Sequence, residues 1–121
     1  MDMTTLIVDD HAGFRSSARL LLEMEGFRVV GEAADGAAAV LAAEALGPEL
    51  VLLDVQLPDT DGFEVAHTIL GRSPGTRIVM VSSRDESDYG DSVVLSGALG
   101  FVGKAALSGP ALRAVLAREA A

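Results

Sequence analysis

Short apolar runs alternate along the chain with segments of helical periodicity, and this alternation limits the folds open to it. The candidate strands, which are short and mostly β-branched or leucine-rich, are 5–8, 28–30, 50–53, 77–81 and 100–102. The candidate helices, which are amphipathic or rich in alanine, are 13–25, 35–46, 63–70, about 85–96 and the segment from 108 onward. The pattern predicts an α/β fold in which five parallel strands and five helices form a three-layer sandwich.

Residues with special backbone or capping properties stand at the predicted helix ends. Gly26 is placed for a left-handed C-cap, and Asp35 for an N-cap. Gly47 and Pro48 close the second helix, and Pro110 stands in the first turn of the last one. The acidic stretch 85–88 suits the positive end of a helix dipole, so one helix is expected from there to about Ser96.

Size and charge narrow the possible functions. The 121 residues fit a single domain, residues 1–121. The chain has no cysteine, but a domain of this size can fold without disulfide bonds. No basic leader stands at the start, and no apolar run reaches the roughly 18 residues of a membrane span, so a cytoplasmic protein without membrane contact is expected. With 18 Asp and Glu against 9 Lys and Arg, the domain lacks the basic face that would bind nucleic acid directly.

Polar residues follow four of the five predicted strands. Asp9 and Asp10 end the first, Asp54 the third and Ser82 the fourth, while the fifth leads to Lys104, the only lysine in the chain. Functional groups in parallel α/β sheets collect outside the carboxyl ends of the strands. We therefore expect three carboxylates, a hydroxyl and an ammonium at one rim.

This set of groups suits phosphoryl transfer. Clustered carboxylates repel one another unless a cation lies between them, and Mg²⁺ (or Mn²⁺) prefers oxygen ligands and phosphate partners. Lys104 and Ser82 can neutralise and bind phosphoryl oxygens. Asp54 follows the most apolar strand, which indicates a central position, and is therefore the predicted nucleophile that forms an acyl phosphate.

Over nearly its whole length the chain resembles the receiver domain of two-component response regulators. The matching segments are Leu6-Ile7-Val8-Asp9-Asp10, Leu50-Val51-Leu52-Leu53-Asp54, Leu57-Pro58-Asp59-Thr60-Asp61-Gly62, Val81-Ser82-Ser83, Gly97-Ala98 and Gly100-Phe101-Val102-Gly103-Lys104. The resemblance implies a flavodoxin-like fold with strand order 2-1-3-4-5. His11, directly after the acid pair, is similar to receivers that precede LuxR-type helix-turn-helix output domains.

The resemblance also implies roles for the residues at the rim. Asp54 would be the phospho-acceptor, Asp10 a direct Mg²⁺ ligand and Asp9 a ligand through water. The backbone carbonyl of Gln56 would be a third protein ligand. The remaining polar contacts to the phosphoryl group would come from Ser82 and Lys104.

The family's signalling switch implies a second group of residues. In it, the residue at Ser82 moves toward the phosphoryl group and an aromatic residue of the fifth strand turns inward, which changes the surface of the fourth helix, fifth strand and fifth helix. The candidate members are Tyr89, Phe101, Leu112 and Arg113. Phe101 lacks the hydroxyl of the tyrosine frequent at its position, and Ala105 follows Lys104 where many receivers have a proline after a cis bond.

The resemblance thus predicts a phospho-acceptor domain served by a sensor histidine kinase. Phosphorylation would favour a homodimer and control an output, expected to be a DNA-binding transcriptional regulator. Catalysis would be limited to the domain's own phosphoryl transfer and dephosphorylation. The alternatives are a stand-alone receiver whose output domain is absent rather than truncated, or a pseudo-receiver that only binds proteins.

Other phosphate-binding classes fit the residues less well. A haloacid-dehalogenase-type phosphatase needs a second acid where this chain has Gln56, and Asp9-Asp10 would repel the phosphate of flavodoxin's cofactor. The chain has neither a dinucleotide nor a P-loop glycine motif. His11 and His67 show no ligand spacing typical of zinc and are expected to be ordinary polar residues.

Overall fold

Five parallel strands form one sheet in the order β2-β1-β3-β4-β5 in a computed structural model that describes residues 3–120. The strands are β1 (Thr4–Val8), β2 (Arg28–Ala33), β3 (Leu50–Asp54), β4 (Arg77–Ser82) and β5 (Gly100–Gly103). All four pairings are parallel, which confirms the predicted α/β class and strand order. The predicted domain, 1–121, includes residues 1, 2 and 121, which lie outside the described residues.

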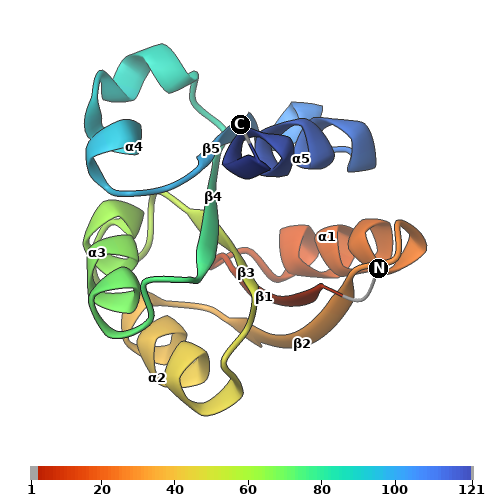
Figure 1. The fold of residues 1–121 in the computed structure, drawn as a ribbon, viewed down its shortest axis with the longest axis horizontal. Helices are drawn as coiled ribbons and strands as arrows, with labels where there is room; N and C mark the ends of the chain where they lie inside the picture. The colour runs from red at the N-terminus through yellow and green to blue at the C-terminus, as the bar shows by residue number, and fades with distance from the viewer. Residues whose placement is uncertain (1–2, 121) are drawn as a thin grey trace.

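Helices cover both faces of the sheet and complete a three-layer sandwich (Figure 1). The α-helices are α1 (Ala12–Met24), α2 (Gly36–Leu46), α3 (Gly62–Arg72), α4 (Ser92–Leu95) and α5 (Gly109–Leu116). Three short 3-10 helices are η1 (Glu86–Tyr89), η2 (Lys104–Ala106) and η3 (Ala117–Ala120). Figure 1 shows α1 and α5 on one side and α2, α3 and α4 on the other. In the part of the chain that the structure describes, no helix is long and apolar enough to span a bilayer.

Each face of the sheet has its own apolar core. Leu22 of α1 and Leu112 of α5 pack with Leu52 on one face. Ile69 of α3 and Val93 of α4 pack with the other. Since β1, β3 and β4 are buried on both faces, their sequences show no alternation of polar and apolar residues.

The helix caps read from the sequence are confirmed. The Asp35 carboxylate accepts a hydrogen bond from the Ala38 N–H at 2.7 Å at the start of α2. The left-handed residue Gly47, with φ of 55°, ends the same helix. Gly26 also has positive φ, 91°, directly after α1.

The predicted fourth helix is not continuous, and this prediction was wrong. The segment forms η1, then breaks at Gly90, and only the single turn α4 follows. The physical reason is local: Asp85 and Asp88 form a capping box on the 3-10 turn, and Gly90 ends it with φ of 56°. Glycine at positive φ cannot continue a right-handed helix, so the acidic stretch begins a separate short element.

Candidate functional site

The strand register brings the predicted polar residues to one edge of the sheet. Val8 pairs with Leu53, so Asp9 and Asp54 follow neighbouring positions on β1 and β3. Asp54 pairs with Val81 of β4, and Ser82 pairs with Gly103 of β5, directly before Lys104. The predicted convergence at the carboxyl ends of the strands is therefore found.

Three carboxylates and a histidine lie close together at this edge. One ligand atom from each of Asp9, Asp10, His11 and Asp54 lies within 4.8 Å of the others. Asp9 is fully buried and Asp54 is 3% exposed, whereas Asp10 faces solvent. Buried carboxylates need a compensating charge, and the cluster therefore requires a cation.

Lys104 supplies part of that charge. Its Nζ lies 2.7 Å from Asp9 Oδ2 and 3.4 Å from Asp54 Oδ2. The same ammonium stands 4.8 Å from the centre of the Phe14 ring, a cation–π contact. Burial disfavours the charged ammonium, but its close contact with Asp9 and the negative charges of Asp9 and Asp54 outweigh this effect and raise the pKa of Lys104.

Burial and a neighbouring charge make Asp54 an unusual carboxylate. Desolvation, and then the charge of Asp9, raise the pKa of Asp54 to about 6, against the opposing effect of Lys104. The Gln56 N–H donates to Asp54 Oδ1 at 3.2 Å. The backbone of the exposed Gln56 also pairs with that of Asp61 in an isolated antiparallel β-bridge before α3. The Asp54 carboxylate is thus held in position by its neighbours, and its negative charge is only partly compensated.

The donor set fits a hard divalent cation. Asp9 Oδ2 is buried and accepts no hydrogen bond from the residues described, because its short contact with Lys104 is an ion pair without hydrogen-bond geometry. Asp10 and Asp54 add carboxylate oxygens beside it. An unsatisfied buried oxygen among carboxylates suits Mg²⁺, which takes oxygen ligands and keeps several waters.

Ser82 lies at the same edge of the sheet, and the predicted switch residue Tyr89 contacts it. Ser82 is buried, and its Oγ lies 2.7 Å from the hydroxyl of Tyr89. The Tyr89 and Phe101 rings are 6.0 Å apart, so these two predicted residues are in contact. Arg113 is exposed and pairs with Glu25, the residue directly after α1, at 2.7 Å.

Leu112 differs from the other predicted surface residues. It is fully buried in the core between α5 and the sheet. Its place in the helical period, with Val115 one turn later, puts it on the inward face. Leu112 is therefore part of the core and not of the exposed surface.

Sequence reasoning missed the contacts that fix the two loops of the site. The His11 ring, expected to be an ordinary polar group, points Nδ1 at Asp9 Oδ1 and Asp10 Oδ1, at 3.1 and 3.0 Å. Arg15 donates to the Asp9 carbonyl at 2.7 Å, and Asp59 accepts from the first two N–H groups of α2, at 2.8 and 3.0 Å. The only sequence signal was the position of His11 and Arg15 in the first turn after the acid pair.

The loop after Lys104 lacks the cis peptide bond that the resemblance associates with a proline at this position. Every peptide bond within residues 3–120 is trans, including Lys104–Ala105. The lysine begins η2, whose Leu107 N–H returns to the Lys104 carbonyl. Alanine at 105 is compatible with this turn because no cis bond is present.

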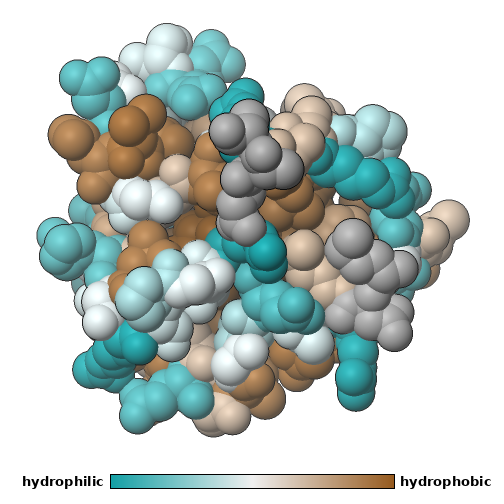
Figure 2. Space-filling model, in the orientation of Figure 1, coloured by the Kyte–Doolittle hydropathy of each residue, from teal (hydrophilic) through white to brown (hydrophobic). Residues whose placement is uncertain are grey.

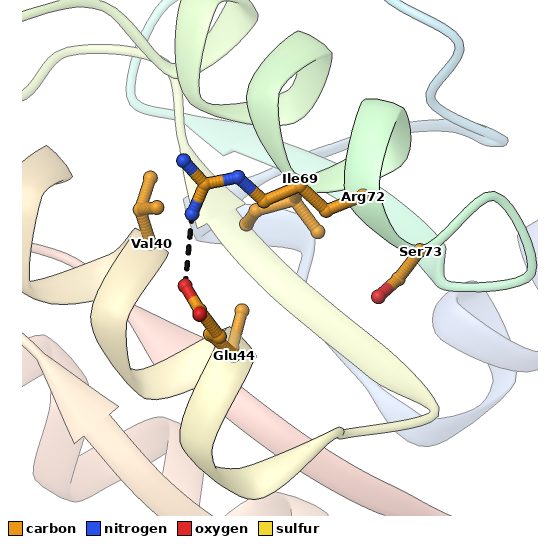
Figure 3. Close-up of a pocket in the computed structure, with 6 residues that line it drawn as sticks. Val40, Glu44, Ile69, Arg72 and Ser73 are labelled. Carbon is orange, nitrogen blue, oxygen red and sulfur yellow. Dashed lines mark hydrogen bonds and ion pairs between the residues drawn. The ribbon is translucent and has the colours of Figure 1, made fainter.

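A cavity of about 440 Å³ lies away from the cluster, between α2 and α3. Figure 3 shows Arg72 reaching from α3 to Glu44 of α2 across it, with Val40 and Ile69 on its walls. None of its lining residues belongs to the predicted site. The predicted site at the strand ends therefore lies outside this cavity.

The geometry agrees with a comparison against known families. The sequence profile of the "Response regulator receiver domain" matches residues 5–116. The chain belongs to this family. Its receiver fold is shared with solved structures, and the resemblance found in the motifs is confirmed.

Curated relatives of this receiver include transcription regulators. The DNA-binding transcriptional activator EvgA of Escherichia coli is 33% identical over 102 residues, which are 84% of this chain and 50% of EvgA. The receiver spans about half the length of the curated relatives it matches.

Solved structures resemble the receiver over most of its length. The signal receiver domain of the response regulator NarL from Mycobacterium tuberculosis has 34% identity and a TM-score of 0.84, covering 95% of this chain and 94% of that one. A LuxR-family response regulator from Aurantimonas has 30% identity and a TM-score of 0.81, covering 86% and 75%. A complex of CheX, CheY, BeF₃ and Mg²⁺ from Borrelia burgdorferi matches with 25% identity and a TM-score of 0.84, covering 94% and 86%.

Proposed function

We propose that this receiver accepts a phosphoryl group on Asp54 from the phosphohistidine of a sensor histidine kinase. The observation that carries the proposal is the buried Asp54 carboxylate, held 3.4 Å from the ammonium of the chain's only lysine and beside Asp9. A buried nucleophile with a partly compensated charge is what attack on a phosphoryl group requires.

The transfer is a displacement at phosphorus. An oxygen of the ionised Asp54 carboxylate forms the new O–P bond while the donor's N–P bond breaks, and the electron pair of that bond returns to the imidazole nitrogen. Lys104 offsets the charge on the phosphoryl oxygens, and the buried Ser82 hydroxyl donates to one of them. The domain performs this transfer and the later hydrolysis on itself, and acts on no other substrate.

A divalent cation completes the charge balance. Asp9, Asp10, Asp54 and the backbone carbonyl of Gln56 would hold Mg²⁺ or Mn²⁺, and the unsatisfied oxygen of Asp9 supports this ligand set. When bound, the ion neutralises charge on the carboxylates and on the phosphoryl oxygens. The related CheY complex contains Mg²⁺ and BeF₃, which supports the assignment.

Phosphorylation then changes the surface that other protein molecules bind. The surface built from α4, β5 and α5 changes around Tyr89, Phe101 and Arg113, with Leu112 beneath it, and favours a homodimer. The relative EvgA is a DNA-binding activator, which supports a cytoplasmic transcription-regulatory output. The net charge of −9 supports an arrangement in which DNA contact is made by a separate output domain and not by this receiver.

Intact-mass spectrometry tests the phospho-acceptor directly. The receiver is incubated with acetyl phosphate and Mg²⁺, and one phosphoryl group per chain is expected on the wild type and none on Asp54→Asn. Asp91→Asn, which changes an exposed aspartate at the start of α4, serves as the matched control and gains mass like the wild type. Equal labelling of wild type and Asp54→Asn would overturn the assignment.

A further inference from the structure

The hydroxyls of Ser82 and Tyr89 form a hydrogen-bonded pair at the edge of the proposed phosphoryl site. The two oxygens are 2.7 Å apart, and Ser82 Oγ also accepts the backbone N–H of Arg84 at 3.1 Å. Ser82 is 1% exposed, so water does not compete freely for its hydroxyl. The family pattern gave Ser82 a phosphoryl contact but assigned no partner to its hydroxyl.

Tyr89 is held in place by two other rings. Its ring meets Phe63 of α3 edge-on at 5.6 Å and Phe101 of β5 at 6.0 Å. Phe101, the aromatic residue of β5, has no hydroxyl. The hydroxyl that contacts Ser82 belongs to Tyr89 of η1 instead. A ring fixed on two sides directs its hydroxyl with little conformational freedom.

The hydrogen-bonding capacity of serine decides what this pair can do. A serine hydroxyl accepts two hydrogen bonds and donates one. The Arg84 N–H fills one acceptor position of Ser82. If the Tyr89 hydroxyl donates to the second, the single proton of Ser82 remains available to donate to another oxygen.

We propose that Tyr89 is a positioning residue that donates its hydroxyl proton to Ser82 and so directs the Ser82 proton to the phosphoryl group on Asp54. This inference rests on the proposed function of Asp54. The phosphoryl oxygen orders the Ser82 proton, and the hydrogen bond from Tyr89 strengthens with it because linked hydrogen bonds polarise one another. The effect of phosphorylation at Asp54 is thereby transmitted through Ser82 and Tyr89 to η1, the segment that leads into α4.

A double-mutant cycle separates this role from simple packing. Tyr89→Phe keeps the ring between Phe63 and Phe101 and removes only the hydroxyl. Phosphorylation by acetyl phosphate, followed by intact mass, is expected to be slower by about three- to tenfold in Tyr89→Phe, the effect of one lost hydrogen bond. In the background of Ser82→Ala, the same change at Tyr89 is expected to have no further effect.

The fluorescence of Tyr89 provides a second measurement. The chain has one tyrosine and no tryptophan, so its tyrosine emission reports the Tyr89 ring alone. Beryllofluoride, a mimic of a phosphoryl group on aspartate, is added with Mg²⁺. The emission is expected to change in the wild type and in the control Ser83→Ala, which alters an exposed neighbour, and to stay constant in Ser82→Ala.

Each outcome has one meaning. A wild type that gains no phosphoryl mass overturns the function proposed for Asp54, and this inference with it. A wild type that gains the mass, with Tyr89→Phe as fast as the wild type or with effects of Ser82 and Tyr89 that add independently, overturns this inference alone. An emission change that persists in Ser82→Ala also overturns it. Slowing that depends on Ser82, with an emission change that depends on Ser82, supports it.

Discussion

Lys104 holds together the two buried acids of this receiver. Its ammonium lies 2.7 Å from Asp9 and 3.4 Å from Asp54, so it compensates the negative charge of Asp9 more strongly than that of Asp54. Lysine carries a compact charge on a flexible stem, and the Phe14 ring covers that charge on one side. The only lysine of the sequence is therefore placed where a point charge must serve two carboxylates.

Lys104→Met is expected to destabilise the receiver in the absence of divalent ions. Removing one member of a buried charge cluster leaves the others uncompensated, which lowers the free energy of unfolding by about 3 kcal/mol. Millimolar Mg²⁺ should restore part of this loss because the ion replaces the missing charge. Urea unfolding with EDTA or with Mg²⁺ measures both effects.

The control for this prediction is Arg84→Met, which removes an exposed positive charge near the same edge. Its unfolding free energy should stay within about 0.5 kcal/mol of the wild type in both buffers. Equal stability of Lys104→Met and Arg84→Met in EDTA would show that Lys104 does not compensate the buried acids.

At the scale of elements, α1 is joined to β2 by ion pairs that also brace the site. Glu32 of β2 pairs with Arg19 at 2.7 Å and with Arg15 at 3.1 Å, and Arg15 continues to the Asp9 carbonyl. The hydrogen bond from Arg19, opposed by burial and assisted by Arg15, lowers the pKa of Glu32 below 4.5. The loop that carries Asp9 and Asp10 is thus fixed to the edge of the sheet.

The stability contributed by Glu32 should depend on pH. A carboxylate whose pKa is lower in the folded chain stabilises the fold above its unfolded pKa and loses this effect as the pH falls through its folded pKa. Glu32→Gln should be less stable than the wild type by up to about 1 kcal/mol at pH 7. The difference should shrink as the pH falls below 4.5, and urea unfolding between pH 3 and 7 measures it.

Glu86→Gln, on the exposed η1, is the control and should differ from the wild type by less than about 0.5 kcal/mol. A Glu32→Gln difference as large at pH 3 as at pH 7 would contradict an ionic origin.

The contact of α3 with the end of β3 gives another prediction. A side chain at Gly62 would meet the backbone of Asp54 and Val55, so α3 can approach the strand only with glycine there. Gly62→Ala should cost about 2 kcal/mol through overpacking and should slow phosphorylation because the Asp54 backbone must shift. Thermal unfolding and the intact-mass assay measure the two effects.

Gly71→Ala is the matched control in the same helix, because nothing lies near its added methyl group. It should stabilise the receiver by up to about 1 kcal/mol through helix propensity. A Gly62→Ala variant as stable as Gly71→Ala would show that the approach of α3 to β3 tolerates a side chain.

At the scale of the whole molecule, apolar side chains remain uncovered on the α4 side. Val94 and Leu95 are 76% and 80% exposed, and Figure 2 shows apolar side chains gathered over α4. This patch adjoins η1, which the contact between Ser82 and Tyr89 links to the proposed phosphoryl site. A change in the surface at η1 is therefore expected to alter the association of two receivers through this patch.

The proposed homodimer predicts a mass that depends on phosphorylation. Sedimentation velocity should give a monomer for the unmodified receiver and a concentration-dependent dimer after treatment with beryllofluoride and Mg²⁺. Val94→Ser with Leu95→Ser should weaken that dimer, whereas the same substitution at the exposed Leu41 of α2 should not. A treated wild type that stays monomeric at all concentrations would contradict the homodimer.

Much of the architecture could be read from local patterns in the sequence. Apolar strands, capping residues such as Asp35 and turn residues such as Gly47 depend on their near neighbours, and these predictions were confirmed. The fourth helix was wrong because one residue, Gly90, outweighed the favourable charge pattern before it. Strand ends also predicted which polar residues meet, since parallel strands align their carboxyl ends.

The sequence by itself therefore determined the order of the elements and the composition of the site. Only the tertiary structure decided how its groups are paired: Lys104 with Asp9, His11 with the acid pair, and Ser82 with Tyr89. The reason is that capping and burial patterns act over a few residues, where spacing is fixed by helix and strand geometry. Contacts between distant residues depend instead on packing across the sheet, which brings Asp54 and Lys104 together although 50 positions separate them.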